Sequence, residues 1–228
     1  MNSVSYQLAL LPGVALPVDG AAQAVGNTVP GAGSRLNFAA IAGDNLGLGI
    51  TGPASNPTPS MNVTASIYRP DGTAFASTNC NTGGTQCAAN LANLPITGSY
   101  FVIVRPVADA TGTLRVWLSR DIGGVMTVGT PMPVAIDRPG RNARISFAGT
   151  AGQTLRFAWS GVAVTGATGL AYAYVYAPGG STLSTASLAN GATAGIDLPP
   201  LPATGTYTIF VDPPFAATMS ANLTVSSR

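Results

Sequence analysis

The stretch "LPATGTYTIFVDP" at Leu201–Pro213 closely repeats the stretch "LPITGSYFVIVRP" at Leu94–Pro106, which lies 107 residues earlier in the chain. Each stretch contains a Pro, a Thr-Gly step and a Tyr, and then alternating large apolar residues. Alternation with a period of two is typical of a β-strand that buries one face. We therefore expect each stretch to form a turn and a core strand, with Tyr100 and Tyr207 as the first inward-facing residues.

The repeat extends beyond this strand. "PGAGSRLNFAAIAG" at Pro30–Gly43 matches "PGRNARISFAGTAG" at Pro139–Gly152, and "SIYRPDGT" at Ser66–Thr73 matches "YVYAPGGS" at Tyr174–Ser181. The offset between matching residues stays between 107 and 109, so insertions are small. Self-similarity at this period, with units of this length, predicts two successive β-sandwich domains.

The repeat also sets the domain boundaries. We place the first domain at residues 12–120 and the second at residues 121–228. Residues 1–11 resemble the last strand of the first unit, so we interpret them as the last strand of a truncated preceding repeat, or as an assembly strand. The residues of that strand that we expect to act in assembly are Val4, Tyr6, Leu8 and Leu10.

The composition disfavours helices. Charged residues make up 8% of the chain: all 10 basic residues are Arg, all 8 acidic residues are Asp, and His is absent. Glu and Lys, which are good helix formers on protein surfaces, are missing. The 28 Gly and 18 Pro residues break helices and mark turns. We therefore predict an all-β chain of two tandem antiparallel β-sandwich (jelly-roll-like) domains, preceded by an orphan N-terminal strand.

The two cysteines frame the segment "CNTGGTQC". A Gly-Gly turn at its centre predicts a hairpin loop that brings Cys80 and Cys87 together. Two thiols without His or Glu cannot complete a zinc site, and the spacing is not that of a redox C-x-x-C motif. A structural disulfide implies an oxidising compartment, so we expect an extracellular or cell-surface protein whose export signal lies outside this sequence.

Catalysis is hard to build from this composition. General acid–base chemistry usually relies on His, Glu or Lys, and all three are missing. Paired aspartates remain possible in principle, but Asp19, Asp71 and Asp137 lie in sequences typical of turn or loop capping. We therefore expect no enzyme and no cofactor.

Outward-facing aromatic residues are the candidates for a functional surface. Trp117 and Arg115 share the outer face of one predicted strand, and Phe101 and Phe210 face outward on theirs. Such rings act as ligand platforms or pack at contacts between domains. Because Trp117 lies close to the domain boundary, we favour the inter-domain interpretation for it. Arg35 and Arg144 recur at equivalent positions, where they could bind an anionic glycan but more often such a residue covers a sheet edge or pairs with a turn Asp. Trp159 replaces an aliphatic residue of the first unit and is expected in the core.

The order of these motifs resembles the pre-peptidase C-terminal (PPC) type of β-sandwich module, found in tandem in large bacterial surface and secreted proteins, including RHS/YD-repeat proteins. The resemblance implies a non-catalytic module that serves as a spacer, an adhesive unit or a carbohydrate- or protein-binding appendage. Some relatives bind calcium. Asp71 and Asp109 have Gly179 and Ala216 opposite them in the second unit, so a calcium site common to both units is not expected.

Three functions remain open. The first is a structural spacer or adhesive stalk of a large bacterial surface or secreted protein, with neighbouring repeats as partners. The second is a module that binds a polysaccharide or a matrix protein. The third is a filament subunit in which Val4–Leu10 completes a neighbouring molecule by strand addition. The scattered arginines indicate no nucleic-acid partner, and no apolar run is long enough for membrane insertion.

Overall fold

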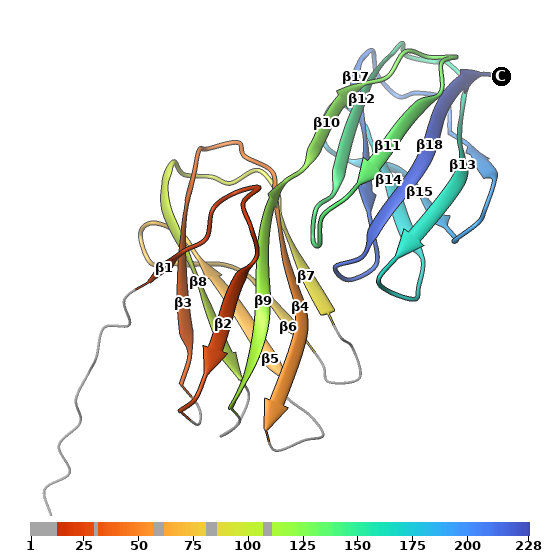
Figure 1. The fold of residues 1–228 in the computed structure, drawn as a ribbon. Coiled ribbons are helices and arrows are strands. Elements are labelled where there is room, and N and C mark those ends of the chain that lie inside the picture. Colours follow the sequence, from red (N-terminus) through yellow and green to blue (C-terminus); the bar gives the residue numbers. More distant parts are fainter. Residues whose placement is uncertain (1–12, 30–31, 57–61, 81–85, 107–110) are drawn as a thin grey trace, which may run out of the picture.

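The computed structural model describes residues 13–29, 32–56, 62–80, 86–106 and 111–228. Within these ranges the chain forms 18 β-strands and no helix, so no described helix is available to cross a membrane. The strands make four sheets, which pair into two sandwiches joined end to end along the chain (Figure 1). The predicted all-β class with two tandem sandwiches is thus confirmed. The expected N-terminal strand at Val4–Leu10, with residues 1–11, lies outside the described residues, as does Asp109.

The first sandwich contains β1 to β9. Its five-stranded sheet has the order β1-β3-β8-β5-β6, and its four-stranded sheet has the order β2-β9-β4-β7. The strand bounds are β1 Val14–Ala15, β2 Gln23–Asn27, β3 Ser34–Ala40, β4 Leu46–Asn56, β5 Val63–Tyr68, β6 Ala74–Cys80, β7 Gln86–Leu91, β8 Gly98–Pro106 and β9 Thr111–Arg120.

The second sandwich contains β10 to β18 in the same arrangement. Its sheets have the orders β10-β12-β17-β14-β15 and β11-β18-β13-β16. The strand bounds are β10 Ile122–Val125, β11 Met132–Ile136, β12 Ala143–Gly149, β13 Leu155–Thr165, β14 Ala171–Tyr176, β15 Thr182–Leu188, β16 Ala194–Asp197, β17 Gly205–Asp212 and β18 Thr218–Ser227.

Each sandwich departs from a purely antiparallel arrangement at one edge. β1 pairs in parallel with β3, and β10 pairs in parallel with β12, whereas the other pairings are antiparallel. Parallel neighbours need a crossover connection. Here β2 and β11, which belong to the opposite sheets, supply that crossover.

The repeated stretches, Leu94–Pro106 and Leu201–Pro213, form the same hydrogen-bonded turn in both domains. The buried Tyr100 hydroxyl donates to the carbonyl oxygen of Ile96 at 2.8 Å and accepts from the Ile96 amide at 3.2 Å. Tyr207 makes the same two bonds to Ala203, at 2.7 and 3.3 Å. A buried tyrosine needs a partner for its hydroxyl, and the turn that precedes the strand provides one. The stretch therefore recurs because hydrogen bonds within it hold its turn against the start of its strand.

The glycine in each repeated stretch is required because a neighbouring turn packs closely against its backbone. A Cβ at Gly98 would lie 2.8 Å from the Cγ of Pro70, and a Cβ at Gly205 would lie 2.8 Å from the Cγ of Pro178. Both prolines belong to the turn between the fifth and sixth strands of their sandwich. The glycine lets that turn pack against the start of the strand that carries the buried tyrosine.

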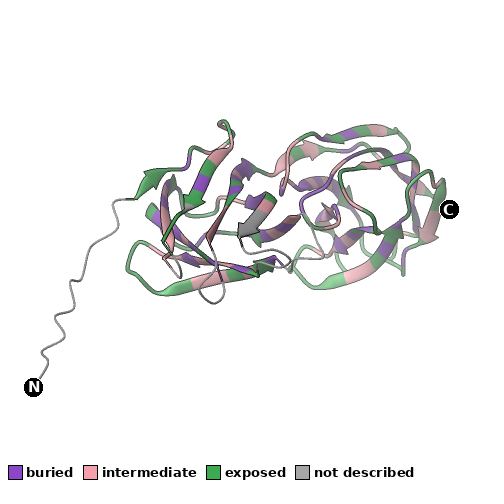
Figure 2. Ribbon diagram, turned by 60° about the horizontal axis from the view of Figure 1, so that its bottom comes forward, coloured by how far each residue is buried: buried purple, intermediate pink, exposed green. Residues whose placement is uncertain are grey.

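The inward residues form one apolar core per domain, as the alternation predicts (Figure 2). Tyr100 and Tyr207 are each fully buried, and Trp159 is 5% exposed in the second core. Trp159 takes the position of Ile50, which is the residue paired with Cys87 in the first domain. Trp159 pairs with Ala194, so the second domain has a large ring and a small partner where the first domain has Ile50 and Cys87.

Cys80 and Cys87 form the predicted disulfide, with a Cα–Cα distance of 5.2 Å. The expected hairpin is not observed, because Cys80 ends β6 in the five-stranded sheet and Cys87 lies in β7 in the four-stranded sheet. The disulfide therefore ties the two sheets of the first sandwich together at one edge. Residues 81–85 between the cysteines lie outside the described residues.

Candidate functional site at the domain junction

The two sandwiches are connected by a single residue. β9 ends at Arg120 and β10 begins at Ile122, which leaves Asp121 between them. The Asp121 amide donates to the carbonyl oxygen of Asn45 at 3.0 Å, and its carboxylate, which is 4% exposed, pairs with Arg144 at 2.8 Å. The connection is therefore held by both domains and has little freedom to bend.

A turn of the second domain docks against bare backbone of the first. Pro139 and Gly140, between β11 and β12, lie directly on the outer face of β4 at Gly47 and Gly49. A Cβ at Gly49 would lie 2.5 Å from the Pro139 carbonyl oxygen, and Gly140 has a φ of 76° and would clash with Gly49 if it carried a Cβ. All of Leu46–Ile50 is buried, so both faces of this strand are covered. Glycine at these positions allows backbone-to-backbone contact.

Arginine side chains surround this contact. The Nε of Arg138 donates to the Ser119 hydroxyl at 2.9 Å, and its guanidinium also donates to the carbonyl oxygen of Gly20. The same guanidinium lies 5.4 Å from the centre of the Trp117 ring. Ser119 is fully buried, and its hydroxyl is satisfied by a residue of the other domain.

Arg141 adds an ion pair across the same junction. It bonds to Asp19 of the first domain and to Asp137 of its own domain at 2.7 Å. Asp19 also accepts a hydrogen bond from the Arg120 amide at 3.1 Å. The expectation that Asp19 and Asp137 cap turns is therefore incomplete, because both carboxylates serve the junction. Asp71, in contrast, accepts from the Thr73 amide at 2.9 Å within its own turn.

A chain of side-chain hydrogen bonds crosses between the domains a second time. The Nδ2 of Asn142, a residue that is 2% exposed, donates to Asn90 Oδ1 at 3.0 Å and to Asp121 Oδ1 at 3.3 Å. Asn90 Nδ2 in turn donates to Asp212 Oδ2 at 3.1 Å. Burial raises the pKa of Asp212 above its ordinary value, against the lowering effect of the Asn90 hydrogen bond. Asn90 of β7 thus bridges the turn before β12 and the end of β17 in the second domain.

The second domain lacks the surface that accepts the turn. Arg156 and Ala158 stand on β13 where Gly47 and Gly49 stand on β4. Arg156 is exposed and pairs with Asp197 at 2.8 Å across the same face. The first domain likewise has Val, Ala and Gly at positions 29, 32 and 33, which match Arg138, Arg141 and Asn142. Both halves of the junction are therefore specific to this pair of domains, although the folds are repeats.

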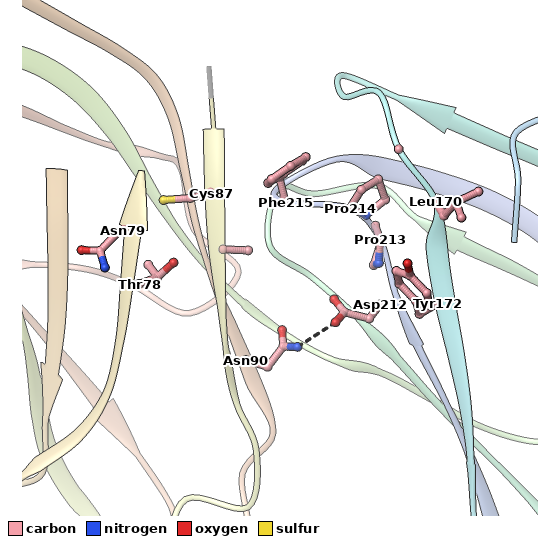
Figure 3. Close-up of a pocket in the computed structure, with 12 residues that line it drawn as sticks. Thr78, Asn79, Cys87, Asn90, Leu170, Tyr172, Asp212, Pro213, Pro214 and Phe215 are labelled. Atoms are coloured by element: carbon pink, nitrogen blue, oxygen red, sulfur yellow. Dashed lines mark hydrogen bonds between the residues drawn. The ribbon is translucent and has the colours of Figure 1, made fainter. Parts of the chain in front are cut away.

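A groove opens beside the contact, between β7 of the first domain and β14 and β17 of the second (Figure 3). On one side of Asn90 lies a cavity of about 470 Å³, with Asn79 and Cys87 on one wall and Tyr172, Asp212 and Phe215 on the other. On the other side lies a cavity of about 540 Å³, lined by Asn90, Arg144, Tyr176 and Phe210 among others. The Asn90–Asp212 hydrogen bond stands between the two cavities.

The residues singled out from the sequence do not form one site. Trp117 is half-buried at the junction, where its Nε1 donates to Thr51 Oγ1 at 3.0 Å, and Arg115 is exposed on the same strand. Phe101 lies on the outer face of the first domain, stacked on Tyr68 at 4.9 Å and covered by Arg35 at 4.0 Å. Phe210 has the outward position that alternation predicts but is only 6% exposed.

Arg35 and Arg144 cover aromatic rings on the outer faces of their sheets. Arg144 lies 4.3 Å from the centre of Phe210 and is paired with Asp121, while the Nε of Arg35 donates to Asn37 Oδ1 at 3.0 Å.

Sequence reasoning missed the tyrosines of β14. Tyr172, Tyr174 and Tyr176 alternate in the segment "YAYVY" and share the outer face of the sheet. Their ring centres are 6.3 Å apart at each step. The signal was present in the repeat, because the first domain has Thr64, Ser66 and Tyr68 at the matching positions.

No family model matches the chain, and no curated protein sequence matches it, so the resemblance to PPC-type modules stays a prediction. Among solved structures, the CBM22-1–CBM22-2 tandem of Paenibacillus barcinonensis Xyn10C is 8% identical, with a TM-score of 0.30 and coverage of 91% of this chain and 87% of that chain. The human MASP-1/3 CUB1-EGF-CUB2 region is 6% identical, with a TM-score of 0.28 and coverage of 90% and 99%. Tripeptidyl peptidase 2 is 8% identical, with a TM-score of 0.31 and coverage of 93% and 24%. TM-scores this low carry no argument about function.

Proposed function

We propose that this chain is a non-catalytic extracellular module that acts as a stiff spacer, or stalk segment, in a bacterial surface or secreted protein. The observation that carries the proposal is the glycine-lined docking of the Pro139–Gly140 turn on β4. A flexible tether between two domains needs neither a one-residue connection nor backbone contact. This junction has both, so it fixes the distance and the angle between the two sandwiches.

The remaining support is chemical. The disulfide between Cys80 and Cys87 suits an oxidising compartment. The aspartates of the junction, Asp19, Asp121 and Asp137, are all engaged with arginines, which leaves them to hold structure and not to transfer protons. The proposal that the chain has no enzyme activity rests on this use of its carboxylates and on the lack of His, Glu and Lys.

Stretching single molecules in magnetic tweezers, with handles at both ends, tests the spacer directly. We expect no extension of the folded chain until a sandwich unfolds in a discrete step, because the junction has no slack. A matched variant with Gly49→Ala should extend measurably at lower force before either domain unfolds. Gradual low-force extension of the wild-type chain, equal to that of the variant, would show that the two domains are hinged and would overturn the proposal.

A further inference from the structure

The outer face of β14 carries a row of three aromatic rings, two of which have no counterpart in the twin domain. Tyr172, Tyr174 and Tyr176 lie on one face, with 33° between the first two ring planes and 13° between the last two. Tyr172 is 40% exposed, and at the rim of the same cavity Phe215 is 60% exposed (Figure 3). Phe215 holds a φ of 55°, a left-handed conformation that is unfavourable for a bulky residue.

The twin domain shows that two of these rings, Tyr172 and Tyr174, are dispensable for folding, whereas Tyr176 matches Tyr68. β5 in the first sandwich occupies the same place as β14 and has the same two neighbours, yet it carries Thr64 and Ser66 where β14 has Tyr172 and Tyr174. A large ring left partly in water on a surface strand adds little to stability when its twin position holds a small polar residue. Tyr172 and Tyr174 therefore point to a role outside the fold.

Polar groups flank each ring. Asp212 of β17 lies directly opposite Tyr172, and Thr208 lies opposite Tyr176. On the other side, Ser187 and Thr185 of β15 are exposed opposite Tyr172 and Tyr174. One oxygen of the Asp212 carboxylate accepts from Asn90, and no residue in the described part of the chain donates to the other oxygen. The middle ring differs, because Tyr174 lies opposite Phe210 on β17, at 6.2 Å between ring centres, and has a polar neighbour only on β15.

The charge of the groove excludes an anionic ligand. Among the described residues that line its two cavities, Arg144 is the only cation, and its guanidinium is already paired with Asp121 and stacked on Phe210. A sulfated or uronic acid chain would meet Asp212 without a free cation to balance it. Tyr172 lines one cavity and Tyr176 lines the other, with Tyr174 between them on the same strand, so a ligand that reaches both cavities must be an extended chain and not a compact cofactor.

From these observations we propose that the groove over Tyr172, Tyr174 and Tyr176 is a binding site for a neutral polysaccharide chain. The sugar rings would stack on the tyrosine faces, which offer large apolar area at low entropy cost. The Asp212 carboxylate and the Asn79 and Asn90 amides would accept and donate hydrogen bonds to sugar hydroxyls. The site combines residues of both domains, so it rests on the fixed junction of the proposed spacer.

The test is affinity electrophoresis of the full chain in gels that contain soluble neutral polysaccharides (a β-glucan, a xylan, a galactomannan), followed by calorimetry with oligosaccharides of any polymer that retards it. The key variant is Tyr172→Thr with Tyr174→Ser, which copies the twin residues and should therefore fold. The matched control is Phe101→Thr, which copies Thr208 onto the first domain and removes a ring outside the groove. We expect at least about a tenfold loss of affinity in the double variant and none in the control.

Four results would overturn the proposal. They are no retardation by any neutral polymer, equal binding by the wild type and the double variant, retardation by anionic polymers alone, and binding of an apolar peptide instead of a polysaccharide. Amide shifts in NMR spectra must also map to β14 and β17 when the oligosaccharide is added. Because the double variant leaves Gly49 and Arg138 unchanged, a failure of glycan binding leaves the stretching result intact. A hinged junction would instead appear in the stretching experiment.

Discussion

Replacement of Gly49 by Ala puts a methyl group where the two domains meet backbone to backbone. Its Cβ would lie 2.5 Å from the Pro139 carbonyl oxygen and 2.6 Å from the carbonyl carbon, whereas ordinary contact starts at 3.4 Å. The turn must therefore withdraw by about 1 Å, since neither atom belongs to a flexible side chain. Hydrogen bonds from the turn to the first domain, at 2.9 Å (Arg138–Ser119) and 3.0 Å (Asn142–Asn90), would then exceed the normal range, and the Arg138 bond to the Gly20 carbonyl oxygen would lengthen as well.

The expected magnitude follows from those three bonds. At a net value of about 1 kcal/mol each, the junction loses roughly 3 kcal/mol of coupling between the domains. Urea unfolding, followed by amide NMR signals of each domain, should show this loss in the free energy of unfolding of the less stable domain. Gly123→Ala is the control, because that glycine also lies in a strand and a Cβ added to it would meet nothing within 4 Å. A Gly49→Ala protein as stable as the wild type would refute the docking argument.

Three further predictions concern the disulfide and two single side chains. Removing the disulfide by Cys80→Ser with Cys87→Ser should lower the stability of the first domain by about 2–3 kcal/mol, as its short loop implies, and leave the second domain's urea midpoint unchanged. Tyr207→Phe should cost about 1 kcal/mol in the same assay, because the exposed Ala203 backbone can bond to water once the hydroxyl is gone. The raised pKa of Asp212 means that the fold favours its protonated form, so this group makes the chain more stable as the pH falls through the folded-state pKa. Asp212→Asn should therefore remove that contribution from the pH profile of unfolding, and an unchanged profile would contradict it.

The sequence was sufficient for the parts of the fold that depend on local pattern. The period of two in "YFVIV" and "YTIFV" assigns Tyr100 and Tyr207 to the core, and both are fully buried. The spacing of Cys80 and Cys87 predicts their disulfide, because a short loop keeps the two thiols close. The sequence did not predict that β6 and β7 would lie in different sheets, because sheet membership depends on contacts between residues that are far apart in the chain.

The candidate site was out of reach for the same reason. Alternation assigns Phe210 to an outer face, but it cannot show that Arg144 and the neighbouring domain cover that face. The more useful signal is the difference between the repeats. The docking surface is marked by Gly47 and Gly49, whose matching residues in the second domain are Arg156 and Ala158. Nothing in a sandwich strand otherwise favours glycine at successive outward positions. Comparing twin positions for residues that the shared fold does not explain would have found the tyrosines of β14 as well.

The most direct test of a fixed junction is to measure residual dipolar couplings for the backbone amides of both domains in one weakly aligned sample. A fixed junction predicts that the couplings of residues 13–120 and of residues 121–228 fit a single alignment tensor, with the relative orientation seen in Figure 1. Two tensors that differ in magnitude or direction would mean that the sandwiches move independently, and the spacer and the composite groove would both have to be abandoned.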